Sequence, residues 1–324
     1  MKIKYFAIAA LIAAIAGVWG CDSDSSDSDD DRLDIVATTT MLEDLVAQLG
    51  GEHVEVHGLV SVGGDPHVYQ PRPDDARVVA ASDAVVMNGL LLEGWMESLV
   101  RNAGGERPII VGGEAVDEEE LIRVEGAVDP HIWFDVGMWR QVTQRVAQGL
   151  IELAGDDEAI AEHVRQSHEA YDQVLKQLDD WVRDQIQTIP SERRVLITSH
   201  DAFNYFGQAY GIDVEAIQGL STEQEASQRD VANIIELVRE RNAPAVFTET
   251  SVHPGLIEQV ARETGIERAG PLYSDSVGPA DSDAHTYVGM VHANVKMIIE
   301  ALQGEYQAFD DTTLTAVDSK GDGA

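Results

Sequence analysis

Residues 64–74 read Gly-Asp-Pro-His-Val-Tyr-Gln-Pro-Arg-Pro-Asp and place one histidine behind a proline, in a segment too rich in Pro and Gly for a helix or a central strand. Pro66 fixes its own φ and drives Asp65 toward an extended conformation, so we expect His67 on a stiff loop. The same tripeptide returns as Asp129-Pro130-His131. A single histidine is more often a core or surface residue, but the repetition on two proline-stiffened loops favours two imidazoles directed at one point.

Short apolar runs alternate with helically spaced segments on both sides of these loops. Alternating βα units of this size form a mostly parallel sheet covered by helices, and ligands bind beyond the carboxyl ends of such strands. Both His loops are expected at that edge. The expected strands lie at residues 33–39, 53–60, 84–88, 108–111, 194–199 and 245–248 and near 268, and the longer helices at 41–49, 91–101, 136–153, 230–242, 254–264 and 284–302.

The longest helical pattern runs from residue 157 to 188, where apolar side chains recur every three, four or seven residues. Such a helix would be about 45 Å long, enough to run across both halves of the molecule. The expected fold is therefore α/β, with two βα lobes whose sheets are mostly parallel, joined by one long rigid α-helix. We expect a first lobe at 33–155, the linking helix at 156–189, a second lobe at 190–304 and a tail without periodicity at 305–324.

Candidate ligands in the second lobe stand at expected strand ends. His200 follows the strand at 194–199, Glu249 ends the strand at 245–248, and Asp275 lies in a polar loop where a strand end is expected. Three neutral imidazoles and a carboxylate suit borderline divalent metals such as zinc or manganese. The remaining histidines have no matching motif, and we expect them at the surface or in structural roles.

The amino-terminal 32 residues have the pattern of a leader and a tether. Residues 1–21 combine a basic start with an apolar run too short for a comfortable membrane span, which is the layout of a secretory signal. Residues 18–21, Val-Trp-Gly-Cys, resemble the lipobox of bacterial lipoproteins and imply cleavage before Cys21 and lipidation there. An uncleaved anchor and an ordinary secretory signal are the alternatives. Residues 22–32 carry six Asp and no apolar residue, which predicts an acidic disordered tether. Because Cys21 is the only cysteine, disulfides and thiolate metal sites are excluded.

The folded body itself is strongly acidic. The whole chain has a net charge of −36, and residues 33–304 alone carry 47 acidic against 18 basic side chains, a net charge of −29. Such a surface argues against nucleic acid and anionic lipid as partners. It is typical of proteins from salt-loving organisms, where salt screens the repulsion between carboxylates. An unusually acidic protein from another source is the alternative.

Four motifs, found in a consistent order, resemble the metal-site motifs of the zinc/manganese solute-binding proteins of ABC importers, the periplasmic metal-binding family 9. They stand at residues 65–73 (DPHVYQPRP), 129–135 (DPHIWFD), 198–206 (TSHDAFNYF) and 273–276 (YSDS), with a further match at 219–223 (GLSTE). The resemblance runs from about residue 33 to about residue 302, and the family fold has two βα lobes joined by one long helix. It implies that the metal ligands are His67, His131, His200 and Asp275.

The resemblance also implies a function, a location and partners. The chain would capture zinc or manganese outside the cytoplasm and deliver it to the permease of an ABC importer and its ATPase, without being an enzyme. It would be a monomer held on the membrane by lipid on Cys21, in the periplasm or at the cell surface. Apart from the resemblance, Asp65 and Asp129 stand two residues before ligands, where they would orient the backbone or the imidazole. Glu249 would form a hydrogen bond with the other ring nitrogen of a ligand, and a loop or edge carboxylate is the alternative for each.

The choice between zinc and manganese (or iron) stays open on the sequence. Some manganese proteins of the family have Glu at the third ligand position, where this chain has His200, and three nitrogen ligands favour zinc. Zinc members often carry a His-rich acidic loop before the second ligand. Residues 113–126 of this chain are acidic but contain no histidine.

Two other functions compete with metal capture. A zinc-dependent hydrolase needs three protein ligands, an open water position and a general base, and the chain has no His-Glu-x-x-His motif. A surface adhesin of the same fold is a role ascribed to relatives, and no sequence feature supports it directly.

The charge of the folded body predicts that salt stabilises it. The Debye length shortens from about 10 Å at 0.1 M to about 3 Å at 1 M salt, so repulsion between the surplus carboxylates weakens over that range. The melting temperature of a soluble fragment starting at Leu33 should therefore rise substantially between 0.1 M and about 1 M sodium chloride. A melting temperature indifferent to sodium chloride would contradict the salt-adapted interpretation.

Overall fold

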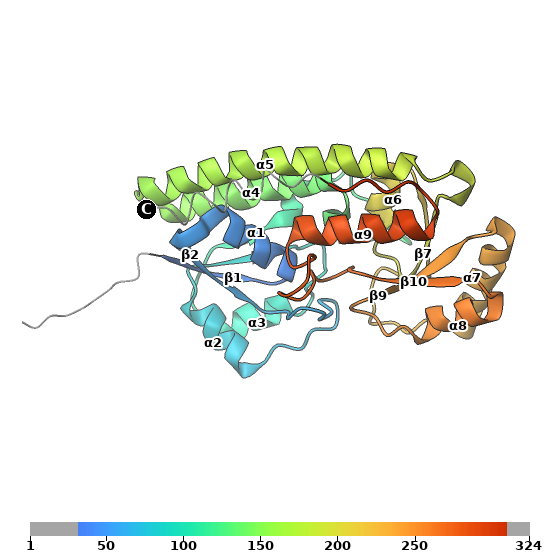
Figure 1. Ribbon diagram of the computed structural model, residues 1–324. Helices are drawn as coiled ribbons and strands as arrows, with labels where there is room; N and C mark the ends of the chain where they lie inside the picture. Colours follow the sequence, from blue (N-terminus) through green and yellow to red (C-terminus); the bar gives the residue numbers. More distant parts are fainter. Residues whose placement is uncertain (1–31, 310–324) are drawn as a thin grey trace, which may run out of the picture. The chain divides into compact units, whose positions relative to one another are not determined.

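A four-stranded, all-parallel sheet organises the first half of the chain, with strand order β2-β1-β3-β4 and helices on both faces (Figure 1). The computed structural model describes residues 32–309, so the predictions for residues 1–31, Cys21 among them, and for 310–324 lie outside the described residues. The elements of this half are β1 (Leu33–Ala37), α1 (Thr40–Gly50), β2 (Val54–Gly58), α2 (Pro73–Ala81), β3 (Ala84–Met87), α3 (Met96–Ala103), β4 (Ile109–Val111), β5 (Arg123–Val124), β6 (Ala127–Val128) and α4 (Val136–Ala154).

Strand β1 shows why both faces of this sheet are covered. Ile35 and Ala37 belong to the same apolar cluster as Leu45 of α1, whereas Val36 belongs to a second cluster with Val79 of α2. Successive side chains of a strand point to opposite faces, so a strand buried on both faces has a continuous apolar sequence. The run at residues 35–37, with all three side chains fully buried, is therefore typical of a central parallel strand.

Parallel strands also form the second half. Strand β7 pairs with β8, β9 pairs with β10, and β7 lies against β9. Val195 and Ile197 of β7 pack with α7 and α8, whereas Leu196 joins the larger cluster on the opposite face. The elements are β7 (Val195–His200), α6 (Asn204–Tyr210), β8 (Asp213–Gln218), α7 (Gln228–Arg241), β9 (Ala245–Glu249), α8 (Gly255–Thr264), β10 (Glu267–Leu272) and α9 (Tyr287–Ala301).

One uninterrupted helix, α5 (Glu158–Gln187), joins the halves. Asp157 caps it by accepting hydrogen bonds from the backbone N–H groups of Ala159 and Ile160. The helix has 30 residues and contacts α1 and α4 of the first half as well as α6 and α9 of the second, and Figure 1 shows it running over both. The predicted α/β class with a long linking helix is confirmed. The buried stripe of α5 consists of Ile160, Ala161, Val164, Tyr171, Val174, Leu175, Leu178, Val182, Gln185 and Ile186.

Three local features differ from the sequence-based expectations. The helix expected at 91–101 begins only at Met96, because Leu90 and Leu91 have φ angles of 55° and 67°, outside the right-handed helical region. Strand β8 was not expected, since most of its side chains are only partly buried and its apolar pattern is weak. The acidic segment before His131 contains the antiparallel hairpin β5–β6.

Residues 32–309 fall within one compact unit. The lobe boundaries expected near residues 155 and 190 therefore stay predictions. Within that described stretch, no helix is both long enough and apolar enough to cross a membrane.

The buried stripe of α5 predicts a large effect of truncating one of its side chains. Leu178 is fully buried in the core cluster, so Leu178→Ala should lower the free energy of unfolding by about 2–5 kcal/mol. Gln177→Ala, one position away on the exposed face, is the matched control and should change it by less than about 0.5 kcal/mol. Urea unfolding measures both, and equal effects of the two substitutions would contradict this packing of α5.

Candidate metal centre

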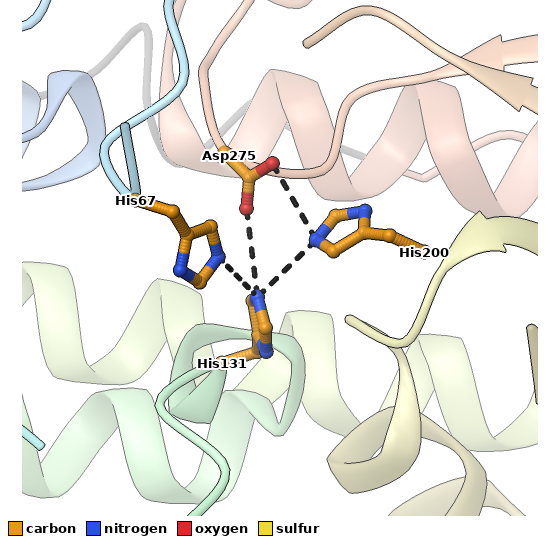
Figure 2. Close-up of side chains that lie close together, drawn as sticks. All are labelled: His67, His131, His200 and Asp275. Atoms are coloured by element: carbon orange, nitrogen blue, oxygen red, sulfur yellow. Dashed lines mark hydrogen bonds and ion pairs between the residues drawn. The ribbon is translucent and has the colours of Figure 1, made fainter. Parts of the chain in front are cut away.

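Four side chains from separate loops and strand ends converge at one buried point (Figure 2). His67 lies between β2 and α2, His131 directly before the 3₁₀ helix Ile132–Phe134, His200 at the end of β7, and Asp275 between β10 and α9. Their potential ligand atoms all lie within 4.8 Å of one another. Among residues 32–309, no other group of three or more possible ligand residues comes this close together. The structure therefore brings together all four residues that the sequence motifs indicate.

The distances from His131 to the other three ligand residues are close to those that a tetrahedral metal ion requires. The Nε2 atom of His131 lies 3.2 Å from that of His67, 3.3 Å from that of His200 and 3.6 Å from Oδ1 of Asp275. His200 Nε2 lies 3.6 Å from the other Asp275 oxygen, Oδ2. Tetrahedral zinc with bonds of 2.0–2.1 Å separates neighbouring ligand atoms by about 3.3 Å. The donor atoms are thus placed to hold one such ion.

Carboxylates orient two of the imidazoles. Asp129 Oδ1 lies 2.7 Å from Nδ1 of His131, and Glu249 Oε2 lies 2.5 Å from Nδ1 of His200. A proton held on Nδ1 leaves the Nε2 lone pair directed at the other ligands, which is the usual arrangement behind a metal-bound histidine. Asp65 differs from these two, because its Oδ1 accepts from the backbone N–H of His67 and not from the ring.

The carboxylate of Asp275 is only half satisfied. Its Oδ2 accepts hydrogen bonds from the hydroxyls of Ser251 and Ser274, at 2.6 and 3.2 Å. Its Oδ1 is buried and has no hydrogen-bond partner among the described residues. A buried carboxylate oxygen without a partner carries a desolvation cost of several kcal/mol, of the order that a bound cation would remove.

Burial and mutual charge set the protonation of the site. Burial lowers the pKa of His67 and lowers that of His131 well below its usual range. Burial also acts to lower the pKa of His200, but the carboxylates of Glu249 and Asp275 outweigh it and raise this pKa to about 10. Burial raises the pKa of Asp129 to about 6, so this side chain remains a carboxylate at neutral pH. Without a cation, His67 and His131 are neutral and His200 carries a proton.

Hydrogen bonds from the second half of the chain hold the His131 loop. Asn204 donates to Oδ2 of Asp129 at 3.0 Å, and the hydroxyl of Tyr205 donates to the Asp129 carbonyl at 2.9 Å. Trp133 donates from its indole to the carbonyl of Ser274, next to Asp275, at 2.9 Å. The roles of these supporting residues and of Ser251 were not predicted, although Asn204, Tyr205 and Trp133 lie inside the quoted motifs. The position of His131 also differs from a sheet strand end, because it follows the small hairpin β5–β6.

A parallel α/β fold with three imidazoles and a carboxylate buried together is the arrangement expected of a solute-binding protein that carries a metal ion. The profile of the family described as "Zinc-uptake complex component A periplasmic" (ZnuA) matches residues 35–301. This protein belongs to that family.

Named relatives and solved structures agree with this assignment. The chain is 36% identical over 307 residues to the manganese-binding lipoprotein MntA of Bacillus subtilis, covering 91% of this chain and 98% of that protein. It is 35% identical over 274 residues to the zinc-binding protein TroA of Treponema pallidum, covering 83% and 88%. The structure of that periplasmic zinc-binding protein superposes with a TM-score of 0.80, at 34% identity, over 84% of this chain and 99% of the other.

The raised pKa of His200 predicts a pH-dependent metal affinity. A metal can bind His200 Nε2 only after its proton leaves, so affinity should rise about tenfold per pH unit between roughly pH 7 and 9. His67 and His131, whose pKa values are lowered, add nothing to this slope in that range. Competition with a chelator of known affinity measures the slope.

Glu249→Gln provides the matched variant for this prediction. Glu249 is the main group that raises the pKa of His200, so its neutral replacement should flatten the slope at neutral pH. An affinity independent of pH in the unmodified protein would show that His200 holds no proton there and would contradict the prediction.

Proposed function

We propose that this protein captures a divalent transition metal, zinc or manganese, outside the cytoplasm and delivers it to the permease of an ABC importer. The observation that carries the proposal is the buried Oδ1 of Asp275, which lacks a hydrogen bond, lies 3.6 Å from Nε2 of His131 and belongs to a buried group with His67 and His200. A buried carboxylate oxygen without a hydrogen bond is a suitable ligand for a cation that the protein binds and later releases. The names of relatives, which are manganese-binding and zinc-binding proteins, support the same function.

We assign His67, His131, His200 and Asp275 as the four ligands of one closed site. Four protein ligands complete a tetrahedral zinc shell, whereas a catalytic zinc keeps one position open for water. This donor set therefore disfavours the alternative of a zinc-dependent hydrolase. The family is one of binding components of metal importers, and the protein is not an enzyme.

Three nitrogen donors and one carboxylate oxygen favour zinc over manganese in affinity, since first-row divalent metals follow that order at such sites. Relatives named for each metal show about the same identity to this chain, 36% and 35%. The cargo in the cell depends on which metal is supplied as well as on affinity. Zinc and manganese are accordingly both included in the proposal.

We infer that the mature protein begins at a lipidated Cys21 and is held at the outer side of a membrane by the tether at 22–32. Relatives named as a manganese-binding lipoprotein and as a metal ABC transporter substrate-binding lipoprotein support this location. A monomer with lobes at 33–155 and 190–304, joined by the helix at 156–189, would present its cargo to the permease, while the ATPase acts on the opposite side of the membrane.

Removing any ligand should abolish tight metal binding. His67→Ala, His131→Ala, His200→Ala and Asp275→Ala should each weaken zinc affinity by roughly a hundredfold or more, because even partners that only orient a ligand are worth 10–100-fold. Isothermal titration of metal-free protein with zinc and with manganese measures the effect.

His163→Ala and His253→Ala are the matched controls, since neither residue belongs to the buried group. Both variants should bind zinc as the unmodified protein does. Unchanged affinity in His200→Ala would remove that residue from the site and reopen the hydrolase interpretation. Failure of the unmodified protein to bind either metal would overturn the proposed function.

A further inference from the structure

A fully buried carboxylate, that of Glu93, lies outside the metal site and binds the turn that follows β3. Glu93 is 3% exposed and stands in the loop between β3 and α3. It accepts hydrogen bonds from the hydroxyl of Thr38 at 2.6 Å and from the backbone N–H groups of Asn88 and Gly89 at 2.7 and 3.0 Å. These three donors are uncharged, and burial raises the pKa of Glu93 in spite of them. Burying such a group costs stability, and its three hydrogen bonds offset that cost by fixing the backbone around it.

The donors to Glu93 lie at the edge of the sheet that faces the metal site. Thr38 follows β1, and Asn88 and Gly89 follow β3, at the carboxyl ends of two neighbouring parallel strands. Binding both backbone N–H groups fixes the turn in which Asn88 lies. The side chain of Asn88, which is 1% exposed, is thereby held in one direction.

Asn88 connects this turn to the loop that carries His131. Its Nδ2 donates to the carbonyl of Pro130 at 3.0 Å and to that of Gly89 at 3.3 Å. The Pro130 carbonyl belongs to the peptide bond that leads into His131, and it also accepts from the backbone N–H of Ile132 at 2.9 Å. Asn88 therefore holds the backbone on which the His131 imidazole is mounted.

His131 is the ligand for which such support matters most. Its Nε2 lies within 3.6 Å of a ligand atom of each of the other three residues, so a displacement of its loop changes every one of these distances. Its Nδ1 partner, Asp129, constrains the ring but belongs to the same loop. Asn88 and Glu93 lie outside that loop and link it to the sheet.

We propose that Glu93 and Asn88 are positioning residues for metal binding, which act through His131 by holding the Pro130 carbonyl. The proposal rests on the proposed function and adds two residues outside the quoted motifs to the metal-binding machinery. Neither residue touches the ion. Both residues keep Nε2 of His131 in place before the metal binds. Less conformational entropy is then lost on binding.

A double-mutant cycle with zinc as the probe tests this route. Asn88→Ala should weaken zinc binding roughly tenfold in the full-length protein and equally in the His67→Ala background. In the His131→Ala background the same change should have almost no effect, because the residue it positions is already gone. Equal losses in all three backgrounds would overturn the proposal and indicate a general structural defect.

A second variant, Glu93→Gln, tests the proposal if Asn88→Ala folds poorly. Glu93→Gln preserves shape but places an amide N–H against a backbone N–H donor, and it should give the same dependence on His131. Glu97→Gln, on the exposed side of α3, and Asn233→Ala, exposed on α7, are the matched controls and should leave zinc affinity unchanged.

Cobalt(II) provides a readout that a loss of stability does not change. Its visible absorption reports ligand geometry, so Asn88→Ala should alter the spectrum of the cobalt-loaded protein while Asn233→Ala should not. An unaltered spectrum together with unaltered zinc affinity would overturn this proposal alone. Absence of zinc binding by the unmodified protein would instead overturn the proposed function, so the two failures are distinguishable.

Discussion

The mutual crowding of four electron-pair donors is the constraint on which the rest of the structure depends. Three imidazole nitrogens and one carboxylate oxygen lie within 4.8 Å of one another, away from water. Low-dielectric surroundings strengthen every unfavourable contact between them. Without a cation these contacts are offset by the proton on His200 and by the hydrogen bonds that Asp129, Glu249 and Ser251 make to three of the four side chains. The surrounding fold has to be rigid enough to keep these donors together. It also has to let a metal ion reach the site and replace the proton on His200.

Rigidity comes from hydrogen bonds that join loops far apart in the sequence. Tyr287 donates from its hydroxyl to the Trp133 carbonyl at 2.8 Å, and the Trp133 indole donates to Ser274. Thr222 donates to Oδ2 of Asp65 at 2.5 Å, which ties the His67 loop to the second half. Each bond joins the two halves of the chain without involving a metal ligand directly. The site is thus largely assembled by the protein, and the metal completes it.

The sequence predicted the metal ligands better than the residues that hold these ligands in place. The two Asp-Pro-His loops are recognisable because the same tripeptide occurs twice, and His200 because it stands at a strand end. Long-range periodicity indicated α5. Glu93 and Asn88 gave no such signal, since a buried carboxylate and an exposed one look alike in a sequence and their partners are backbone atoms. The helix expected at 91–101 was placed too early because its apolar pattern does not reveal the left-handed conformations of Leu90 and Leu91.

The continuous helix α5 restricts how this protein can change in length. Each residue added inside an α-helix advances the chain by about 1.5 Å and rotates all that follows by about 100°. Because α5 contacts α1 and α4 near one end and α6 and α9 toward the other, a one-residue insertion would turn one set of contacts away from its partners. The contacts at its two ends therefore require α5 to keep its length. A change of length within α5 is expected to disrupt the core more than one in the loops beyond its two ends.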